Sequence, residues 1–354
     1  MKVQKQIIEY ITKRGERLAN EIDLIVCYGS YVTGNATALS DVDLFYIPRT
    51  DNHELSETFI LNGVGYDIFP LSWDILQDIA DFHNHLSPLL GDSIILFSHS
   101  DEERQRYEEL KERMERNMND EDLMKNRAIK RLKKAVLYNS QIQQATDLSL
   151  ARELAVKHLN TLTTCIAYQN QTYFHKGLKA QYQELQMFTR LPEDFLALYQ
   201  EVPQAQNLSA LQSATGKLFS TATAFSYQPT DYYIKPDSPK EMSAATPDYH
   251  QAATWYEEVC SSFNKIYACE LSGNYILAFL TAGSLQSSLK EDLSISIATK
   301  ELLSVFDWKN LAPLCQRARE IERDITISFI TAGITLHRYK TIDELYQYHG
   351  LLMK

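Results

Sequence analysis

The sequence predicts an α+β fold, in which an N-terminal mixed β-sheet is followed by a larger, all-helical region. Short apolar runs bounded by turn residues are typical of strands, and they are concentrated before residue 100. From Asp101 onward, apolar residues recur at the three- and four-residue spacing of amphipathic helices. A chain of 354 residues is long enough for two or three domains, each with its own core.

The first 100 residues predict one domain built around a sheet. Asn62 and Gly63 give a strong hairpin signal between two of its strands. Ser72 is placed to cap the helix that follows the hairpin. The expected elements are a helix over 3–20, strands over 22–28, 42–47, 58–61 and 66–71, a helix over 72–82 and a strand over 94–97.

The remaining residues predict two helical segments. The stretch 228–250 is rich in Pro, Asp, Ser and Thr, which indicates a linker between a helical domain over 101–227 and a C-terminal helical segment over 251–354. The expected helices cover 101–117, 120–146, 149–171, 178–188, 193–201, 205–225, 248–271, 273–291, 296–305, 308–337 and 341–350.

One stretch early in the chain carries the chemistry. The apolar run 22–28 ends at Gly29 and Ser30, and the residues that follow, 31–36, are expected to form a short helix. A strand that ends in a Gly-Ser turn and opens a helix presents backbone N–H groups and a hydroxyl to an anion. The segment therefore predicts a phosphate cradle.

Two aspartates begin the next strand. Asp41 and Asp43 are separated by one residue, so both side chains project from one face of the strand, roughly 7 Å apart along the chain. Two carboxylates that point the same way repel each other unless a cation lies between them. Each motif alone is commonly a plain turn or a solvated strand end, but together they predict a divalent-metal site beside a phosphate cradle.

The combined pattern, GS-x3-G-x5-SDVDL, resembles the signature of the DNA polymerase β-like nucleotidyltransferases. Its spacing is most similar to the small-molecule branch, which includes aminoglycoside and lincosamide nucleotidyltransferases of antibiotic resistance. The resemblance covers about residues 20–100. It implies a Mg²⁺-dependent transfer of a nucleoside monophosphate, AMP from ATP or the equivalent group of another NTP, to a hydroxyl of a small molecule, with release of pyrophosphate.

The resemblance also implies roles for individual residues. Asp41 and Asp43 would hold Mg²⁺, since all the expected ligands are hard oxygens. Gly29 and Ser30 would bind the nucleotide phosphates. Asp67, in the second arm of the hairpin, would complete the metal cage or take the proton from the acceptor hydroxyl.

Helical domains in this superfamily often supply a lysine that closes over the nucleotide. Lys176 is the candidate here, because it precedes a glycine helix stop in a segment rich in aromatic and basic residues. A second basic feature is a stripe at helical spacing that consists of Arg127, Lys130, Arg131 and Lys134. It is either a solvated helix face or a positively charged surface that lies near the triphosphate or near the end of a tRNA.

Composition bears on location and partners. The formal net charge is −11, which disfavours a general nucleic-acid binder and would attract a cationic small molecule. Five scattered cysteines predict reduced thiols, and the chain lacks a signal-peptide core and long apolar runs. We therefore expect a cytoplasmic enzyme with no membrane partner. Two alternatives stay open: nucleotide transfer onto a protein or a tRNA, as in toxin-like members, and a catalytically silent nucleotide-binding module.

Overall fold

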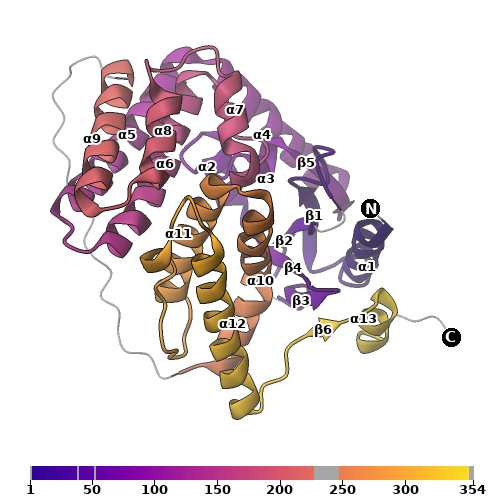
Figure 1. The fold of residues 1–354 in the computed structure, drawn as a ribbon. Helices are drawn as coiled ribbons and strands as arrows, with labels where there is room; N and C mark the ends of the chain where they lie inside the picture. The colour runs from indigo at the N-terminus through magenta and orange to yellow at the C-terminus, as the bar shows by residue number, and fades with distance from the viewer. Residues whose placement is uncertain (1, 38–39, 52, 227–246, 351–354) are drawn as a thin grey trace.

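The sheet has six strands and mixed pairing (Figure 1). The structure is a computed structural model that describes residues 2–37, 40–51, 53–226 and 247–350. Its strand order is β5-β1-β2-β4-β3-β6. The β2–β4 and β3–β6 pairs are parallel, and the other pairs are antiparallel. The strands are β1 (Ile22–Tyr28), β2 (Asp43–Pro48), β3 (Glu57–Leu61), β4 (Val64–Pro70), β5 (Ser93–Ser98) and β6 (Arg338–Tyr339).

Helices cover both faces of this sheet. The first helix, α1 (Lys2–Arg17), packs Ile7 and Ile11 on one face, where alternate strand residues such as Ile25 are fully buried. The opposite face, which includes Val26 and Phe45, shares one continuous core with the later helices. Because both faces are buried, β1 is apolar along almost its whole length, with Asp23 the exception.

The central helices form a bundle beyond the sheet (Figure 1). The long helices α5 and α6 pack along each other through small and aliphatic side chains, among them Ala128, Ala135 and Ala155. The helices of this region are α2 (Trp73–Ala80), α3 (Pro88–Gly91), α4 (Asp101–Asn119), α5 (Glu121–Gln144), α6 (Leu148–Gln169), α7 (Gln181–Met187), α8 (Phe195–Gln204) and α9 (Leu208–Ser226), with a 3₁₀ turn, η1 (Leu178–Ala180), before α7.

The last segment returns to the sheet. It contains α10 (Tyr249–Ser272), α11 (Tyr275–Glu291), a 3₁₀ turn η2 (Leu303–Val305), α12 (Ala312–Ala332), β6 and α13 (Ile342–Tyr348). Helix α10 packs on β3 and β4, on the face opposite α1 (Figure 1). After α12, β6 joins the edge of the sheet beside β3, and α13 packs on α1.

The α+β architecture is confirmed, and most predicted elements occur within a few residues of their expected bounds. The Asn62-Gly63 turn joins β3 to β4 with positive φ at both residues, as a tight hairpin requires. The domain bounds 1–100, 101–227 and 251–354 stay a prediction. Residues 228–246 of the predicted linker lie outside the described residues.

Two helix predictions were wrong, and a third had the wrong bounds. Residues 31–34 form turns and 35–36 have no regular structure, and 296–305 contains only the 3₁₀ turn η2. The helix predicted over 308–337 begins at Ala312 and ends at Ala332, because Gly333 takes a left-handed conformation with φ of 70°. The strand β6 (Arg338–Tyr339) follows, between the helices expected over 308–337 and 341–350, where no strand was expected. It is only two residues long, so its sequence carries no periodic signal.

A buried glutamate of α10 binds the C-terminal return, the segment around His337 that leads from α12 to β6. Glu257 is 1% exposed, and its carboxylate accepts hydrogen bonds from the backbone N–H of His337 and, at 3.2 Å, from the imidazole Nδ1. The carbonyl of His337 in turn accepts a hydrogen bond from Ile60 N at 2.7 Å. Burial raises the pKa of Glu257, and its contacts with His337 oppose that increase.

Replacing Glu257 with Ala is therefore expected to destabilise the protein. The change leaves the backbone N–H of His337 without its acceptor, which costs about 2 kcal/mol. Glu257→Gln keeps an acceptor at this position and should lose less stability. Urea unfolding of the parent and both variants measures the difference. An alanine variant as stable as the parent would show that Glu257 does not fasten the C-terminal return.

Candidate active site

The predicted phosphate cradle is a compact turn. Strand β1 ends at Tyr28, and the next residue, Gly29, has a φ of +75°. Thr33 N donates to Gly29 O at 3.0 Å, and Asn35 N donates to Ser30 O at 2.9 Å. Gly34, with φ of +73°, reverses the chain. We call residues 29–34 the glycine turn. Its β-branched residues and final glycine are weak helix formers, which explains why no helix follows.

The sheet register brings the aspartates together. Asp43 is the first residue of β2 and lies opposite Tyr28 of β1. On its other side, Leu44 of β2 pairs with Ile68 of β4 in a parallel register, so Asp67 lies beside Asp43 on the neighbouring strand. Alternation along the strands places both carboxylates on the sheet face that α10 covers. Asp41 lies two residues before β2, so Asp67, Asp43 and Asp41 form a row of carboxylates.

Asp43 and the glycine turn are in direct contact. A Cβ on Gly29 would lie 2.3 Å from the Oδ2 of Asp43, so only glycine allows the turn to come this close. The backbone of Ser30 also lowers the pKa of Asp43, against the effect of burial. The glycine turn and Asp43 thus lie side by side, while their binding of phosphate and metal stays a prediction.

The electrostatics of the site are those of crowded carboxylates. Burial raises the pKa of Asp41, and burial together with the neighbouring Asp41 raises that of Asp43. The pKa of Tyr28 is raised by burial and then by Asp43, Asp41 and Asp67, so all three carboxylates act on one phenol. Asp67 accepts a hydrogen bond from Thr58 Oγ1 at 2.7 Å. Burial raises the pKa of Asp67 as well.

The two carboxylates of Asp41 and Asp43 are ligands that suit Mg²⁺. Among the residues that the structure describes, no group of three or more His, Cys, Asp or Glu side chains is arranged to hold a metal ion. Asp41 and Asp43 offer two anionic oxygen ligands, and Mg²⁺ in nucleotide sites is commonly bound by one or two carboxylates, with water and phosphates at the other positions. The mutual repulsion of the pair also favours a cation beside it.

Helix α10 contributes two residues that sequence reasoning missed. Lys265 lowers the pKa of Asp41 and Asp43, against the effect of burial. Glu258 remains accessible to solvent, but the surrounding protein raises its pKa, and Asp67 and Asp292 add to the increase. The two residues are seven positions apart, which is two helical turns, so they lie on one face of α10.

Lys176 lies in a loop that reaches the glycine turn. Gly29 N donates to the carbonyl of Asp92 at 3.2 Å, and the Asp92 carboxylate is 2.9 Å from Nδ1 of His175. Glu184 accepts hydrogen bonds from the backbone N–H groups of His175 and Lys176, each at 2.8 Å. The structure therefore brings Lys176 near the turn, while its contact with a nucleotide stays a prediction.

The contact between His175 and Asp92 predicts a pH-dependent stability. The hydrogen bond to Asp92 raises the pKa of His175. A raised histidine pKa stabilises the fold below the unfolded-state value of about 6.5, and this contribution disappears as pH rises through the folded-state pKa. We expect parent stability relative to His175→Gln to fall from pH 6 to pH 8, by less than about 1 kcal/mol because the imidazole is partly exposed. Urea unfolding across this range measures it, and parallel pH profiles would contradict the assignment.

The basic stripe has a structural use. Arg127 Nε donates to Asp81 O at 2.8 Å, and Arg131 donates to His83 O at 3.3 Å. Both carbonyls lie just beyond the C-terminal end of α2, where a cation is favourable. These two arginines therefore hold α2 against α5, which differs from both sequence interpretations. Burial and two nearby cations, Arg131 and Lys134, lower the pKa of His85 to about 4.

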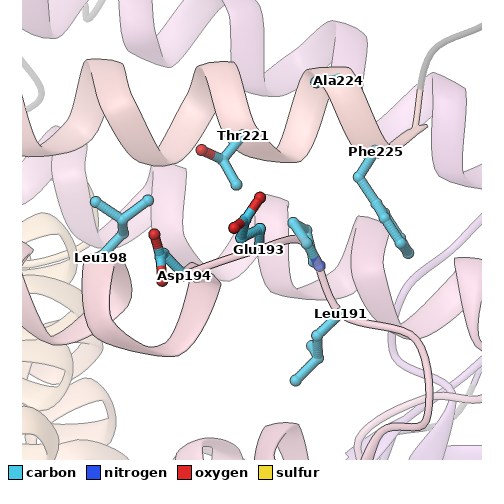
Figure 2. A pocket seen from close by; sticks show the side chains of 8 residues that line it. Leu191, Glu193, Asp194, Leu198, Thr221, Ala224 and Phe225 are labelled. Carbon is cyan, nitrogen blue, oxygen red and sulfur yellow. The ribbon is translucent and has the colours of Figure 1, made fainter.

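A pocket of about 380 Å³ lies elsewhere, between α9 and the segment before α8 (Figure 2). Its walls include Leu191, Leu198 and Phe225, with the carboxylates of Glu193 and Asp194 at one side. None of the candidate site residues lines it. The acidic row of the sheet instead lies under α10.

One comparison with known proteins covers the residues of this site. A family model described as nucleotidyltransferase domain matches residues 5–142, which include the glycine turn, Asp41, Asp43 and Asp67. This match supports nucleotidyl transfer as the general activity of the N-terminal part, which is less than half of the chain. A search of curated proteins finds no match.

Among solved structures, the chain is similar to a nucleotidyltransferase-like protein from Exiguobacterium sibiricum 255-15. It is 11% identical, with 92% of each chain covered and a TM-score of 0.37. In the described part of the chain, no helix is both long and apolar enough to cross a membrane.

Proposed function

We propose that the protein is a Mg²⁺-dependent nucleotidyltransferase that moves AMP from ATP onto a hydroxyl of a small molecule and releases pyrophosphate. The observation that carries the proposal is the contact between Asp43 and Gly29, which joins a row of three carboxylates to the glycine turn. The family match over residues 5–142 supports the same reaction class.

In this reaction some residues of the site hold the metal ion, and others bind the nucleotide phosphates. Asp41 and Asp43 hold the metal ion, which when bound draws the nucleotide phosphates together and offsets charge in the transition state. Gly29 and Ser30 face the phosphates that leave as pyrophosphate, and Lys176 adds a positive charge from the loop bonded to Asp92. These groups position the α-phosphate for in-line attack.

The transfer requires a proton acceptor. The acceptor oxygen forms a bond to the α-phosphorus, the bond from that phosphorus to the leaving pyrophosphate oxygen breaks, and the hydroxyl proton passes to a carboxylate. Asp67 and Glu258 are both candidates, because each has a raised pKa and faces this side of the site. Asp67 lies on β4 beside Asp43, whereas Glu258 comes from α10.

The acidic surroundings favour a cationic acceptor. Asp67, Glu258 and Asp292 lie near one another at the end of the carboxylate row, and the net charge of the chain is −11. An acceptor with several amino groups, such as an aminoglycoside antibiotic, would be attracted to such a surface. A polyanionic acceptor such as tRNA would be repelled, which is why a small molecule is preferred over the tRNA alternative.

Product analysis tests the proposal. Each of the four NTPs is incubated with protein and Mg²⁺, alone and with aminoglycosides, lincosamides, tRNA or protein extract, and pyrophosphate is measured. Pyrophosphate release that depends on an antibiotic supports the proposal. Release that depends on tRNA or protein selects the toxin-like alternative, and nucleotide binding without release in any mixture indicates a silent module.

A further inference from the structure

The loop 170–177, which joins α6 to η1, is bonded to the sheet beside the glycine turn. Asp92 immediately precedes β5, whose first residue pairs with the last residue of β1. The backbone carbonyl of Asp92 accepts a hydrogen bond from Gly29 N at 3.2 Å. Both oxygens of its carboxylate lie 2.9 Å from Nδ1 of His175. One residue is therefore bonded both to the glycine turn and to the loop.

The loop fits closely against the sheet and has little freedom there. A Cβ on Gly91 would overlap the hydroxyl group of Tyr173, so any larger residue at this position would displace the tyrosine. The rings of Tyr173 and His175 pack on each other, with their centroids 4.1 Å apart. Glu184, which is 8% exposed, accepts hydrogen bonds from the backbone N–H groups of His175 and Lys176. The backbone on both sides of the imidazole is thus held in place.

The bond between His175 and Asp92 has a defined direction and a local effect. A carboxylate only accepts hydrogen bonds, so Nδ1 of His175 carries the hydrogen. The side chain of His175 is 41% exposed, and the bond therefore contributes little to the stability of the whole fold. Through Asp92, however, it connects the residue before Lys176 to Gly29, the first residue of the glycine turn.

We propose that His175 and Asp92 are positioning residues that fix Lys176 relative to the glycine turn, so that the lysine and the turn bind the same nucleotide phosphates. The inference rests on the proposed function, because it takes both groups to bind phosphate. Two groups from distant parts of the chain bind one ligand more tightly when their separation is fixed beforehand. Without the bond to Asp92, the loop would have to be ordered when the nucleotide binds, and the affinity would fall.

Two substitutions of His175 separate its hydrogen bond from the packing of its ring. His175→Phe keeps an aromatic ring beside Tyr173 and removes the donor. His175→Asn removes the ring and places an amide N–H close to the position of Nδ1. Both variants should fold, because the side chain is partly exposed. If His175→Phe does not fold, Asp92→Ala takes its place, because it removes the same bond and keeps the carbonyl that binds Gly29 N.

The measurement is calorimetric titration of the full chain with the α,β-methylene analogue of ATP and Mg²⁺, without an acceptor. We expect His175→Phe to bind the analogue about tenfold more weakly than the parent, and His175→Asn to stay within about threefold of it. His83→Phe is the matched control. His83 is a similarly exposed imidazole, 3.5 Å from the Asp78 carboxylate at the end of α2, and its replacement should leave the affinity unchanged.

A double-mutant cycle tests whether His175 acts through Lys176. In a protein that already carries Lys176→Ala, His175→Phe should change the affinity by less than about twofold, because no ammonium is left to position. A histidine that only stabilised the fold, or that bound the phosphates itself, would weaken binding by the same factor in both backgrounds.

The outcomes distinguish the inference from the proposed function. If the parent does not bind the analogue, both fail. If the parent binds it and Lys176→Ala does not weaken binding, or His175→Phe binds like the parent, the positioning role is overturned and nucleotide binding stands. Additive losses in the double-mutant cycle, or a loss in His175→Asn but not in His175→Phe, overturn the role as well. A loss in His175→Phe that is small in His175→Asn and absent without Lys176 supports it.

Discussion

Asp43→Asn is expected to reduce nucleotidyl transfer by about a thousandfold or more while leaving the fold intact. The asparagine keeps the size of the side chain and removes the negative charge that would hold the metal ion. Loss of a metal-bound charge in the transition state raises the barrier by several kcal/mol, and about 1.4 kcal/mol corresponds to a factor of ten. Pyrophosphate release under saturating ATP and Mg²⁺ measures the loss.

The stability of this variant provides a second readout. Asp43 is crowded by Asp41 in a partly buried row, and both burial and that neighbour raise its pKa. Removing one of two like charges should leave the metal-free protein equally stable or more stable, by up to about 2 kcal/mol. Urea unfolding measures it. A strong loss of stability would mean that Asp43 is a structural residue.

Asp23→Asn is the matched control for this experiment. Asp23 is another aspartate of the sheet, 8% exposed, but its carboxylate accepts a hydrogen bond from Trp73 Nε1 at 2.9 Å and lies 3.5 Å from the Arg49 guanidinium. Its neutralisation should cost about 1 kcal/mol of stability and leave transfer unchanged. The opposite pattern in the two variants would contradict the assignment of the site.

Gly29→Ala should impair both transfer and stability. The added Cβ would meet the Oδ2 of Asp43 at 2.3 Å, and the φ of +75° is strained for alanine. Either the turn or the carboxylate must move. We expect a loss of about 1–3 kcal/mol in stability and about a hundredfold in transfer, because displacement of a reacting geometry by 1 Å can have that effect.

Gly34→Ala separates backbone strain from the contact with Asp43. Gly34 has nearly the same φ, +73°, but a Cβ there would have no atom within 4 Å. This variant should therefore lose about 1 kcal/mol of stability and little activity. Thermal unfolding and steady-state kinetics of both variants make the comparison. Equal losses of activity in the two variants would show that the distance between Gly29 and Asp43 is irrelevant to function.

The sheet and its carboxylates could be predicted because their signals are local. Strand β1 is a short apolar run that ends at Gly29, and the alternation of Asp41, Val42 and Asp43 fixes the face of each side chain. The hairpin turn at Asn62 and Gly63 sets the register of β3 on β4, the strand that carries Asp67. These features need only a few neighbouring residues.

The other wall of the site could not be predicted, because it depends on contacts distant in sequence. Gly65 and Ser261 are 196 residues apart, and no local pattern shows that they are bonded. Lys265 and Glu258 therefore look like ordinary polar positions of an amphipathic helix until α10 is placed on β4. A glycine inside a strand, such as Gly65, was the one available signal, since it often marks a close approach of another backbone.

The fate of the ATP phosphates tests the central claim most directly. The parent protein is incubated with Mg²⁺, the antibiotic panel and ATP labelled at either the α- or the γ-phosphate, and the labelled products are separated. Nucleotidyl transfer predicts that the α-label appears on the acceptor and the γ-label in pyrophosphate. A γ-label on the acceptor, or its release as orthophosphate in place of pyrophosphate, would contradict the account.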